Sequence, residues 1–530
     1  MSKRRKSKAP GDDRSPVKIR QLPTGVPGLD EILGGGLPEY SFNIIAGSPG
    51  CGKTTLAHQI IFANASKERP AIYFTVLGEP AIKMLRYQQQ FTFFDEAKLD
   101  GAIRFVNLSK FILNNDLGAV LEAIVKEVEA ANAKVVVVDS FRTVVRKALA
   151  NANEMELQGF VQRLALHLTS WQATTFLIGE YAEGEIRDNP VFTVADGLLW
   201  LYQSIERNSI VRKMHVMKLR GQESVPGLHT FRITQGGLQT FPRTFGLNGD
   251  ARHVKGRRRV STGVRELDAI MGGGIPEGDS LLVAGPSGAG KTVLGMQFIA
   301  EGLRSGRGKP VEPGIVAMFE ELPDEYFERA TKFGIDLAKP RKDGTLKFIY
   351  LRPLDLSVDE TLHEVVTAVK EIGCKRLVID SLVGFELALA PGFRTDFRES
   401  LYRMIGALTR MGVTILSTVE IEEDFTSMSL SNFTVSFLAD DIVRMRYVSI
   451  DGQLRKMLMV VKMRRSQHGI DMCEYKITSE GLAIGEPLRG YRGLMTSVPG
   501  PWSSQSGQTA PVPAPQTVRA PNKKRKSKPR

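Results

Sequence analysis

Short apolar runs alternate with longer amphipathic stretches along most of the chain. Runs such as FNIIAG at 42–47, AIYFTV at 71–76 and VVVVD at 135–139 recur at intervals of about 30–45 residues, and stretches with helical spacing such as 117–132 lie between them. Runs that are apolar throughout are typical of strands covered on both faces, and the alternation of strand and helix is typical of parallel sheets. The pattern predicts an α/β fold in which mostly parallel sheets are flanked by helices.

The same order of strands, helices and motifs occurs twice along the chain. Matching segments keep their order, and their offset drifts only from 238 to 244 residues: 24–39 with 262–277, 42–62 with 281–300, 135–141 with 376–382, and 215–221 with 459–465. Such self-similarity indicates a tandem duplication of one domain. We therefore predict a basic tail at 1–16, a first domain at 17–248, a linker at 249–259, a second domain at 260–488 and a basic Pro/Ser-rich tail at 489–530.

The net charge of +13 comes from the two ends of the chain. Residues 1–20 carry a net charge of +6 and residues 499–530 carry +7, whereas 21–498 hold 56 basic and 56 acidic residues. A neutral core argues against a nucleic-acid groove between the two tails. The tails are expected to be disordered, and they serve either to bind an anionic partner such as nucleic acid or only to solubilise the chain.

Composition narrows the class of protein further. The chain of 530 residues is 42% hydrophobic and 24% charged, which is ordinary for globular proteins. No apolar run approaches the length of about 18 residues that a membrane span needs, and the charged N-terminus does not resemble a secretory signal. Three scattered cysteines form no disulfide or metal spacing. We expect a cytoplasmic protein with no membrane association.

Two segments match the phosphate-loop pattern G-x-x-x-x-G-K-[ST], each between an apolar strand and a helical stretch. Glycines let backbone N–H groups surround a phosphate, the lysine reaches the β- and γ-phosphates, and the hydroxyl reaches Mg²⁺. We expect both to bind ATP, through Gly47, Ser48, Pro49, Gly50, Cys51, Gly52, Lys53, Thr54 and Thr55 in the first copy, and Gly285, Ser287, Gly288, Ala289, Gly290, Lys291, Thr292 and Val293 in the second.

Acidic residues follow the apolar strands at the places where a phosphate-loop protein holds Mg²⁺. Asp139 and Asp380 end their strands 86 and 89 residues after the loop lysines. We expect them to hold Mg²⁺ with Thr54 and Thr292. The alternative is that each Asp only caps the helix that follows.

Hydrolysis also needs a group that orients or deprotonates the attacking water. In the second copy Glu320 and Glu321 follow the next strand, where adjacent carboxylates favour a general base, and Glu320 is also a candidate metal ligand. A solvated turn is the alternative. The first copy has Leu77-Gly78 at this place, with Glu79 displaced. We therefore expect the first copy to bind ATP and to hydrolyse it slowly, if at all.

Each copy also contains two cations that flank an apolar residue, in Lys218-Leu219-Arg220 and Lys462-Met463-Arg464. On a strand both cations face the same side. Their recurrence favours a role in trans on the γ-phosphate held by a neighbouring subunit, over an exposed strand face.

Together these motifs make the chain similar to the KaiC-like family of tandem RecA-like ATPases over about 17–488. They are TGVxxLDxxxGGGxPE before each loop, the paired glutamates, Asp-Ser after the apolar strand, and Lys-x-Arg. The resemblance implies double-ring homohexamers with ATP between subunits, and serine/threonine autokinase activity in the second domain. It places the phosphoacceptor at Ser436, where Phe437 replaces the second acceptor. It also places His468 near the nucleotide and Phe333 near adenine.

Two other functions remain open at this point. A RecA or RadA-type DNA-dependent ATPase would use the basic tails, although the fused duplicate and the neutral core disfavour it. An ATP-gated signalling scaffold would display the ring to a protein partner such as a histidine kinase, and the lost glutamate pair of the first copy is compatible with that.

Overall fold

The computed structural model describes most of the two repeats. The described residues are 19–76, 81–109, 117–144, 154–186, 189–206, 209–243, 258–304, 310–351, 357–389, 397–421, 439–489, 491–492 and 500–501. No described helix has both the length and the apolar character needed to cross a membrane.

The first repeat alternates strands and helices up to β8 and then continues with strands. Its strands are β1 (Gln21–Leu22), β2 (Leu37–Pro38), β3 (Phe42–Gly47), β4 (Ala71–Thr75), β5 (Ile103–Asn107), β6 (Val135–Asp139), β7 (Thr174–Glu180), β8 (Gly197–Glu206), β9 (Ser209–Leu219), β10 (Leu228–Thr234) and β11 (Gly237–Phe241). Its helices are α1 (Leu29–Ile32), α2 (Lys53–Asn64), α3 (Ala81–Gln88), η1 (Glu96–Leu99), α5 (Leu117–Ala131), α7 (Glu154–Ser170), η2 (Glu183–Ile186) and α8 (Pro190–Val194).

The second repeat follows the same order. Its strands are β12 (Arg259–Val260), β13 (Ile275–Pro276), β14 (Ser280–Gly285), β15 (Gly314–Met318), β16 (Leu346–Tyr350), β17 (Arg376–Asp380), β18 (Thr414–Glu420), β19 (Asp441–Ile450), β20 (Gln453–Met463), β21 (Cys473–Thr478) and β22 (Gly481–Pro487). Its helices are α9 (Arg265–Ile270), α10 (Lys291–Leu303), α11 (Pro323–Lys332), α12 (Ala338–Lys342), α13 (Val358–Ile372), α14 (Leu382–Ala388) and α16 (Phe397–Arg410). A short pair, β23 (Tyr491–Arg492) and β24 (Gly500–Pro501), follows.

Among the described residues, each repeat builds one nine-stranded sheet with the same strand order. The orders are β11-β10-β9-β8-β3-β7-β6-β4-β5 and β22-β21-β20-β19-β14-β18-β17-β15-β16. Neighbouring strands from β5 to β8, and from β16 to β19, run parallel, and the remaining strands add antiparallel. The predicted class of two tandem α/β domains with mostly parallel sheets is confirmed.

Both faces of each sheet are covered by helices. In the first repeat, α5 and α7 close one face around Phe160 and Leu164, and α2 closes the other face around Leu56 and Ile60, all of them without solvent exposure. Because both faces are covered, the central strands are apolar throughout: all six residues of β3 are buried. The apolar runs of the sequence therefore became the middle of each sheet.

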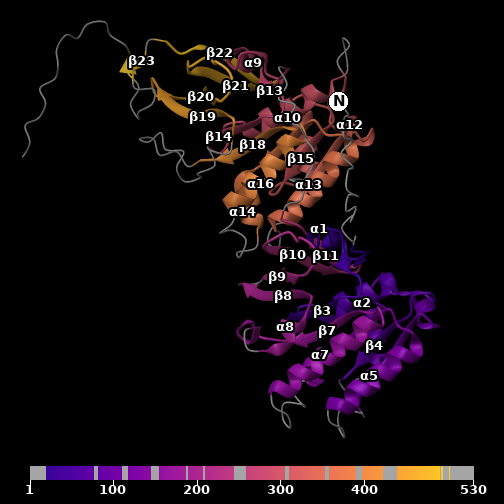
Figure 1. The fold of residues 1–530 in the computed structure, drawn as a ribbon. Helices are drawn as coiled ribbons and strands as arrows, with labels where there is room; N and C mark the ends of the chain where they lie inside the picture. Colours follow the sequence, from indigo (N-terminus) through magenta and orange to yellow (C-terminus); the bar gives the residue numbers. More distant parts are fainter. Residues whose placement is uncertain are drawn as a thin grey trace, which may run out of the picture.

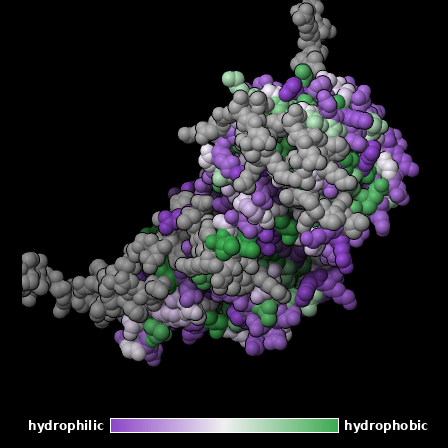
Figure 2. Space-filling view, turned by 90° about the horizontal axis from the view of Figure 1, so that it is seen from below, coloured by the Kyte–Doolittle hydropathy of each residue, from purple (hydrophilic) through white to green (hydrophobic). Residues whose placement is uncertain are grey.

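The two repeats form two bodies that meet where the β10–β11 hairpin contacts α13 and where Arg243, which follows β11, pairs with Glu399 of α16 (Figure 1). Arg232 of β10 pairs with Glu360 of α13 at 2.7 Å, and the ring of Phe241 packs edge-on against His363 of α13. On the face seen in Figure 2, the described surface is mostly hydrophilic, with hydrophobic side chains in small groups.

Candidate functional site: two phosphate loops

Each phosphate loop connects the carboxyl end of a central strand to the first turn of a helix. Gly52 and Gly290 immediately precede α2 and α10 with φ of 103° and 98°, a left-handed conformation that favours glycine. A Cβ at Gly52 would lie 2.7 Å from the side chain of Ile233. The loops thus bring their backbone N–H groups to a helix N-terminus, the arrangement that binds phosphate.

The loop lysines are held by carbonyl groups of their own loops. Lys53 Nζ donates to Ser48 O at 2.7 Å, and Lys291 Nζ donates to Gly285 O and Pro286 O at 3.0 and 2.8 Å. Burial lowers the pKa of Lys291, and the nearby carboxylates of Glu420, Asp380 and Glu320 act in the opposite direction. Both ammonium groups therefore lie beside the glycine turns where a phosphate would bind.

In the first repeat, the metal-site candidates are in direct contact. Thr54 Oγ1 donates to Asp139 Oδ2 at 2.8 Å, although the two residues are 85 positions apart. Tyr73 OH, from β4, donates to the same oxygen at 2.7 Å. Burial raises the pKa of Asp139, and the two hydroxyl donors and Lys53 oppose this shift. The sequence had indicated Thr54 and Asp139 but not Tyr73.

In the second repeat, Asp380 is the last residue of β17 and pairs with Met318, the last residue of β15. Asp380 therefore lies next to the segment that follows β15. Its Oδ1 accepts a hydrogen bond from Thr418 Oγ1 of β18 at 2.5 Å. Thr292 is the second residue of α10, directly after Lys291. Thr418, like Tyr73, was not among the residues predicted from the sequence.

The two glutamates of the second repeat have different partners. Glu320 Oε1 accepts a hydrogen bond from Ser381 Oγ at 2.9 Å, so it lies next to the residue after Asp380. Glu321 pairs with Arg329 of α11 at 2.7 Å. Burial is the largest cause that raises the pKa of Glu321, while Arg329 lowers it. Of the two carboxylates, Glu320 is thus the one tied to the strand end that carries Asp380.

The Lys-x-Arg segments have equivalent contacts in both repeats. Lys218 and Lys462 lie one residue before the ends of β9 and β20, and they donate to the carbonyls of Thr193 and Ala439 at 3.0 and 2.7 Å. Arg220 pairs with Asp196, as does Arg464 with Asp440. Leu219 and Met463 point toward the core clusters of their sheets. The alternation predicted from the sequence is present, with each arginine directly after its strand.

Other predicted residues lie farther from the loops or outside the described part. His468 is half-buried, and its Nδ1 lies 2.9 Å from Gly469 O. Phe333 follows α11 and lines a cavity of about 630 Å³ together with Gln297 of α10 and Arg304, the residue after α10. Cys51 is fully buried in its loop, and burial raises the pKa of its thiol. Glu79, Ser436 and Phe437 lie outside the described residues.

Sequence reasoning also missed an acid on the strand beside each phosphate loop. Glu180 ends β7 and pairs in register with Gly47, and Glu420 ends β18 and pairs with Gly285. The signal was present, because both repeats place a Glu at the end of an otherwise apolar strand.

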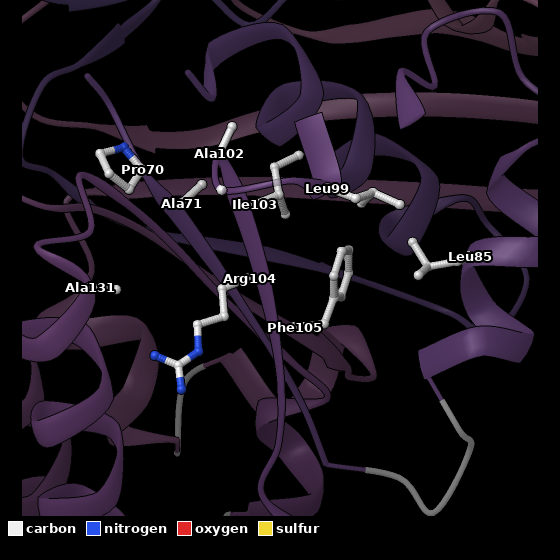
Figure 3. A pocket seen from close by; sticks show the side chains of 10 residues that line it. Pro70, Ala71, Leu85, Leu99, Ala102, Ile103, Arg104, Phe105 and Ala131 are labelled. Atoms are coloured by element: carbon white, nitrogen blue, oxygen red, sulfur yellow. The ribbon is translucent and has the colours of Figure 1, made fainter. Parts of the chain in front are cut away.

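A second cavity, of about 450 Å³, lies at the opposite end of the first sheet (Figure 3). Its lining includes Ala71 and Ile103, the first residues of β4 and β5, together with Leu85 and Phe105. Ligands of open α/β sheets bind at the carboxyl ends of the strands, where Gly47 and Asp139 lie. This cavity is therefore separate from the phosphate loop.

The oxygen donors of the first site suit Mg²⁺, which prefers hydroxyl, carboxylate, phosphate and water ligands. Thr54 and Asp139 supply two such groups in contact with each other. Within the described ranges, no three or more His, Cys, Asp or Glu side chains are grouped to hold a metal by themselves. A Mg²⁺ ion at this site would therefore draw further ligands from phosphate oxygens and water, as it does in phosphate-loop proteins.

The fold and the loops define a tandem phosphate-loop protein with two nucleotide sites of the same plan. Its two repeats, at residues 22–244 and 260–489, each match the family model described as "ATPase: KaiC". The chain belongs to this family.

Relatives align over nearly the whole length of both chains. The chain is 28% identical to the circadian clock oscillator protein KaiC of a Picosynechococcus strain, over 91% of this chain and 92% of the relative. It is 29% identical to KaiC of Parathermosynechococcus lividus, over 91% and 89%, and 28% identical to KaiC 1 of a Synechocystis strain, over 91% and 92%.

Proposed function

We propose that the chain binds ATP with Mg²⁺ at both phosphate loops and hydrolyses it mainly in the second repeat. One observation carries this proposal: both repeats bring the loop lysine, the Thr at the helix start and the Asp at the strand end to one edge of the sheet, and among the residues that the structure describes, the second repeat adds Glu320 beside this acid. In the first repeat the residues at this position are Leu77 and Gly78.

In this proposal each residue has a defined task. The loop glycines and Lys53 or Lys291 bind the phosphates, and Thr54 with Asp139, or Thr292 with Asp380, holds Mg²⁺, which neutralises charge on the phosphates. Glu320 orients and deprotonates the attacking water, and the ion pair with Arg329 leaves Glu321 a supporting role. Lys218, Arg220, Lys462 and Arg464 act on the nucleotide of a neighbouring subunit in a homohexamer.

We further propose serine/threonine autokinase activity in the second repeat, with Ser436 as acceptor. The Ser436 hydroxyl would attack the γ-phosphorus of ATP as the bond to ADP breaks, and Glu320 would accept the hydroxyl proton. Phe437 in place of a second acceptor predicts at most one phosphate at this pair. Since the relatives are named circadian clock oscillator proteins, we place the activity in signalling or clock-like regulation, with a protein partner such as a histidine kinase.

The test is ATP turnover together with phosphopeptide mapping on the full chain. Glu320→Gln should slow turnover by about 10²–10⁴-fold if Glu320 is the general base. Glu79→Gln is the matched change in the first repeat and should have a smaller effect. If Glu79→Gln instead abolishes most turnover, the first repeat is the main hydrolase.

The mapping and a DNA control separate the remaining functions. Phosphate at Ser436 after incubation with ATP and Mg²⁺ supports the autokinase. Its absence from residues 425–437 of a protein that hydrolyses ATP would leave an ATPase scaffold. A turnover rate that rises with single-stranded DNA would favour the recombinase function instead.

A further inference from the structure

The acid at each metal site receives a hydrogen bond from a different buried hydroxyl. In the first repeat the donor is Tyr73 OH, at 2.7 Å from Asp139 Oδ2. In the second repeat it is Thr418 Oγ1, at 2.5 Å from Asp380 Oδ1. Neither Tyr73 nor Thr418 has any solvent exposure. The two repeats therefore fix equivalent carboxylates with residues of different chemistry.

The two hydroxyls also come from opposite neighbours of the strand that ends in the acid. Tyr73 lies on β4, on one side of β6, whereas Thr418 lies on β18, on the other side of β17. The strand registers place Ile178 at the position of Thr418 in the first repeat and Val316 at the position of Tyr73 in the second. Each repeat thus has an apolar residue where the other has its hydroxyl.

The tyrosine is held in place by the phosphate-loop helix. His58 of α2 stacks on the Tyr73 ring with centroids 4.4 Å apart, and its Nδ1 lies 2.8 Å from Thr54 O. A carbonyl only accepts, so Nδ1 carries the proton, and burial keeps the ring neutral by lowering its pKa to about 4. The second repeat has Met296 at the position of His58. One packed unit therefore contains Thr54, His58, Tyr73 and Asp139.

We propose that Tyr73 and Thr418 are positioning residues that set the Mg²⁺ dependence of the two nucleotide sites independently. A hydroxyl donor to a metal-site carboxylate fixes its rotamer and leaves the other oxygen available for the metal or its water. In the first repeat Tyr73 and Thr54 share one oxygen of Asp139, whereas Thr418 takes one oxygen of Asp380 in the second. This inference rests on the proposed binding of Mg²⁺ and ATP at both loops.

The experiment measures nucleotide binding rather than turnover, with fluorescent N-methylanthraniloyl-ADP titrated with Mg²⁺ on the full chain. Lys291→Ala leaves the first site as the reporter, and Lys53→Ala leaves the second. In the first reporter, Tyr73→Phe should raise the Mg²⁺ concentration for half-maximal binding about tenfold. This is the lower end of the loss of metal affinity that follows when a residue supporting a metal ligand is removed. Binding in EDTA should stay unchanged, because the ring still packs on His58.

The second reporter provides an independent arm. Thr418→Val should raise its Mg²⁺ requirement about tenfold, and Thr418→Ser, which keeps the hydroxyl, should restore it. Tyr87→Phe, on the exposed face of α3, is the matched tyrosine control and should change nothing.

Each other outcome has a defined meaning. A shift below twofold for both Tyr73→Phe and Thr418→Val, or an equal loss of binding in EDTA, overturns the positioning role while the proposed function stands. If both reporters bind no nucleotide at any Mg²⁺ concentration, the proposed function fails first and this inference fails with it.

Discussion

Asp441 is a buried acid whose ionisation is disfavoured by its surroundings. It is fully buried at the first position of β19, and burial, together with the carboxylates of Asp279 and Asp440, raises its pKa to about 7. Arg465 pairs with Asp279, and Arg464 pairs with Asp440. The surrounding cations also include Arg259 and Lys462. In the first repeat Gly197 occupies the position of Asp441, so only the second repeat carries this buried acid.

This environment predicts a pH dependence with a definite sign. An unfolded Asp ionises near pH 4, so between about pH 4 and 7 the folded chain binds more protons, and stability falls as pH rises through this window. Asp441→Asn removes the cost of ionisation and should stabilise the protein at pH 8 by up to about 4 kcal/mol, and much less at pH 5. Denaturant unfolding at both pH values measures it. The exposed Asp343→Asn is the control, and an equal effect of Asp441→Asn at pH 5 and 8 would contradict the prediction.

Spacing alone indicated some residues of the sites but not others. The loop lysines and the acids 86 and 89 positions later could be found because a motif ties each of them to a strand end. Tyr73 and Thr418 could not, because their contacts depend on which strands become neighbours of β6 and β17. A hydroxyl inside an otherwise apolar strand, as in AIYFT, was the only signal.

Among the elements, the β10–β11 hairpin connects the two repeats. The Arg232–Glu360 pair lies at this contact, and burial raises the pKa of Glu360 while Arg232 lowers it. Arg232→Ala should therefore destabilise the chain by about 1 kcal/mol, because it leaves a partly buried carboxylate without this partner. Arg232→Ala with Glu360→Gln should cost less than the sum of the two single changes, as measured in a thermal-unfolding cycle.

The matched control for this cycle is an exposed pair inside one repeat. Lys347 and Glu371 are about half exposed, so Lys347→Ala should change stability little. Additive effects of the Arg232 and Glu360 changes would show that the hairpin contact does not couple the repeats energetically.

The elements themselves were predictable to different degrees. The apolar runs at 42–47 and 135–139 became β3 and β6, and the amphipathic stretch 117–132 became α5. The antiparallel half of each sheet was not predicted, since long strands exposed on one face lack a continuous apolar run. For β19 and β20 a local signal existed: Asp451 and Gly452, with φ of 51° and 72°, form the two-residue turn favoured in hairpins.

At the scale of the whole molecule, the Lys-x-Arg segment of each repeat is held in place by hydrogen bonds and an ion pair within its own repeat. Lys218 donates to the carbonyl of Thr193 in α8, and Lys462 donates to the carbonyl of Ala439, just before β19. Charges that act in trans need a second subunit, so ATP that connects one subunit's phosphate loop to these cations would stabilise a ring. We therefore expect ATP with Mg²⁺ to convert the chain into a homohexamer with two stacked layers of six sites.

The variants of the loop lysines separate the contributions of the two layers. Lys53→Ala should weaken assembly more than Lys291→Ala, because the first repeat has Leu77-Gly78 in place of Glu320-Glu321 and should retain ATP longer between subunits. Light scattering coupled to size exclusion, with saturating ATP and Mg²⁺, measures the fraction that has six times the mass of one chain.

Arg220→Ala and Arg464→Ala then test the trans contacts, and each should reduce this fraction without reducing nucleotide binding to the isolated subunit. A chain that remains a monomer under these conditions would exclude the ring, and equal losses for Lys53→Ala and Lys291→Ala would show that both layers hold it together.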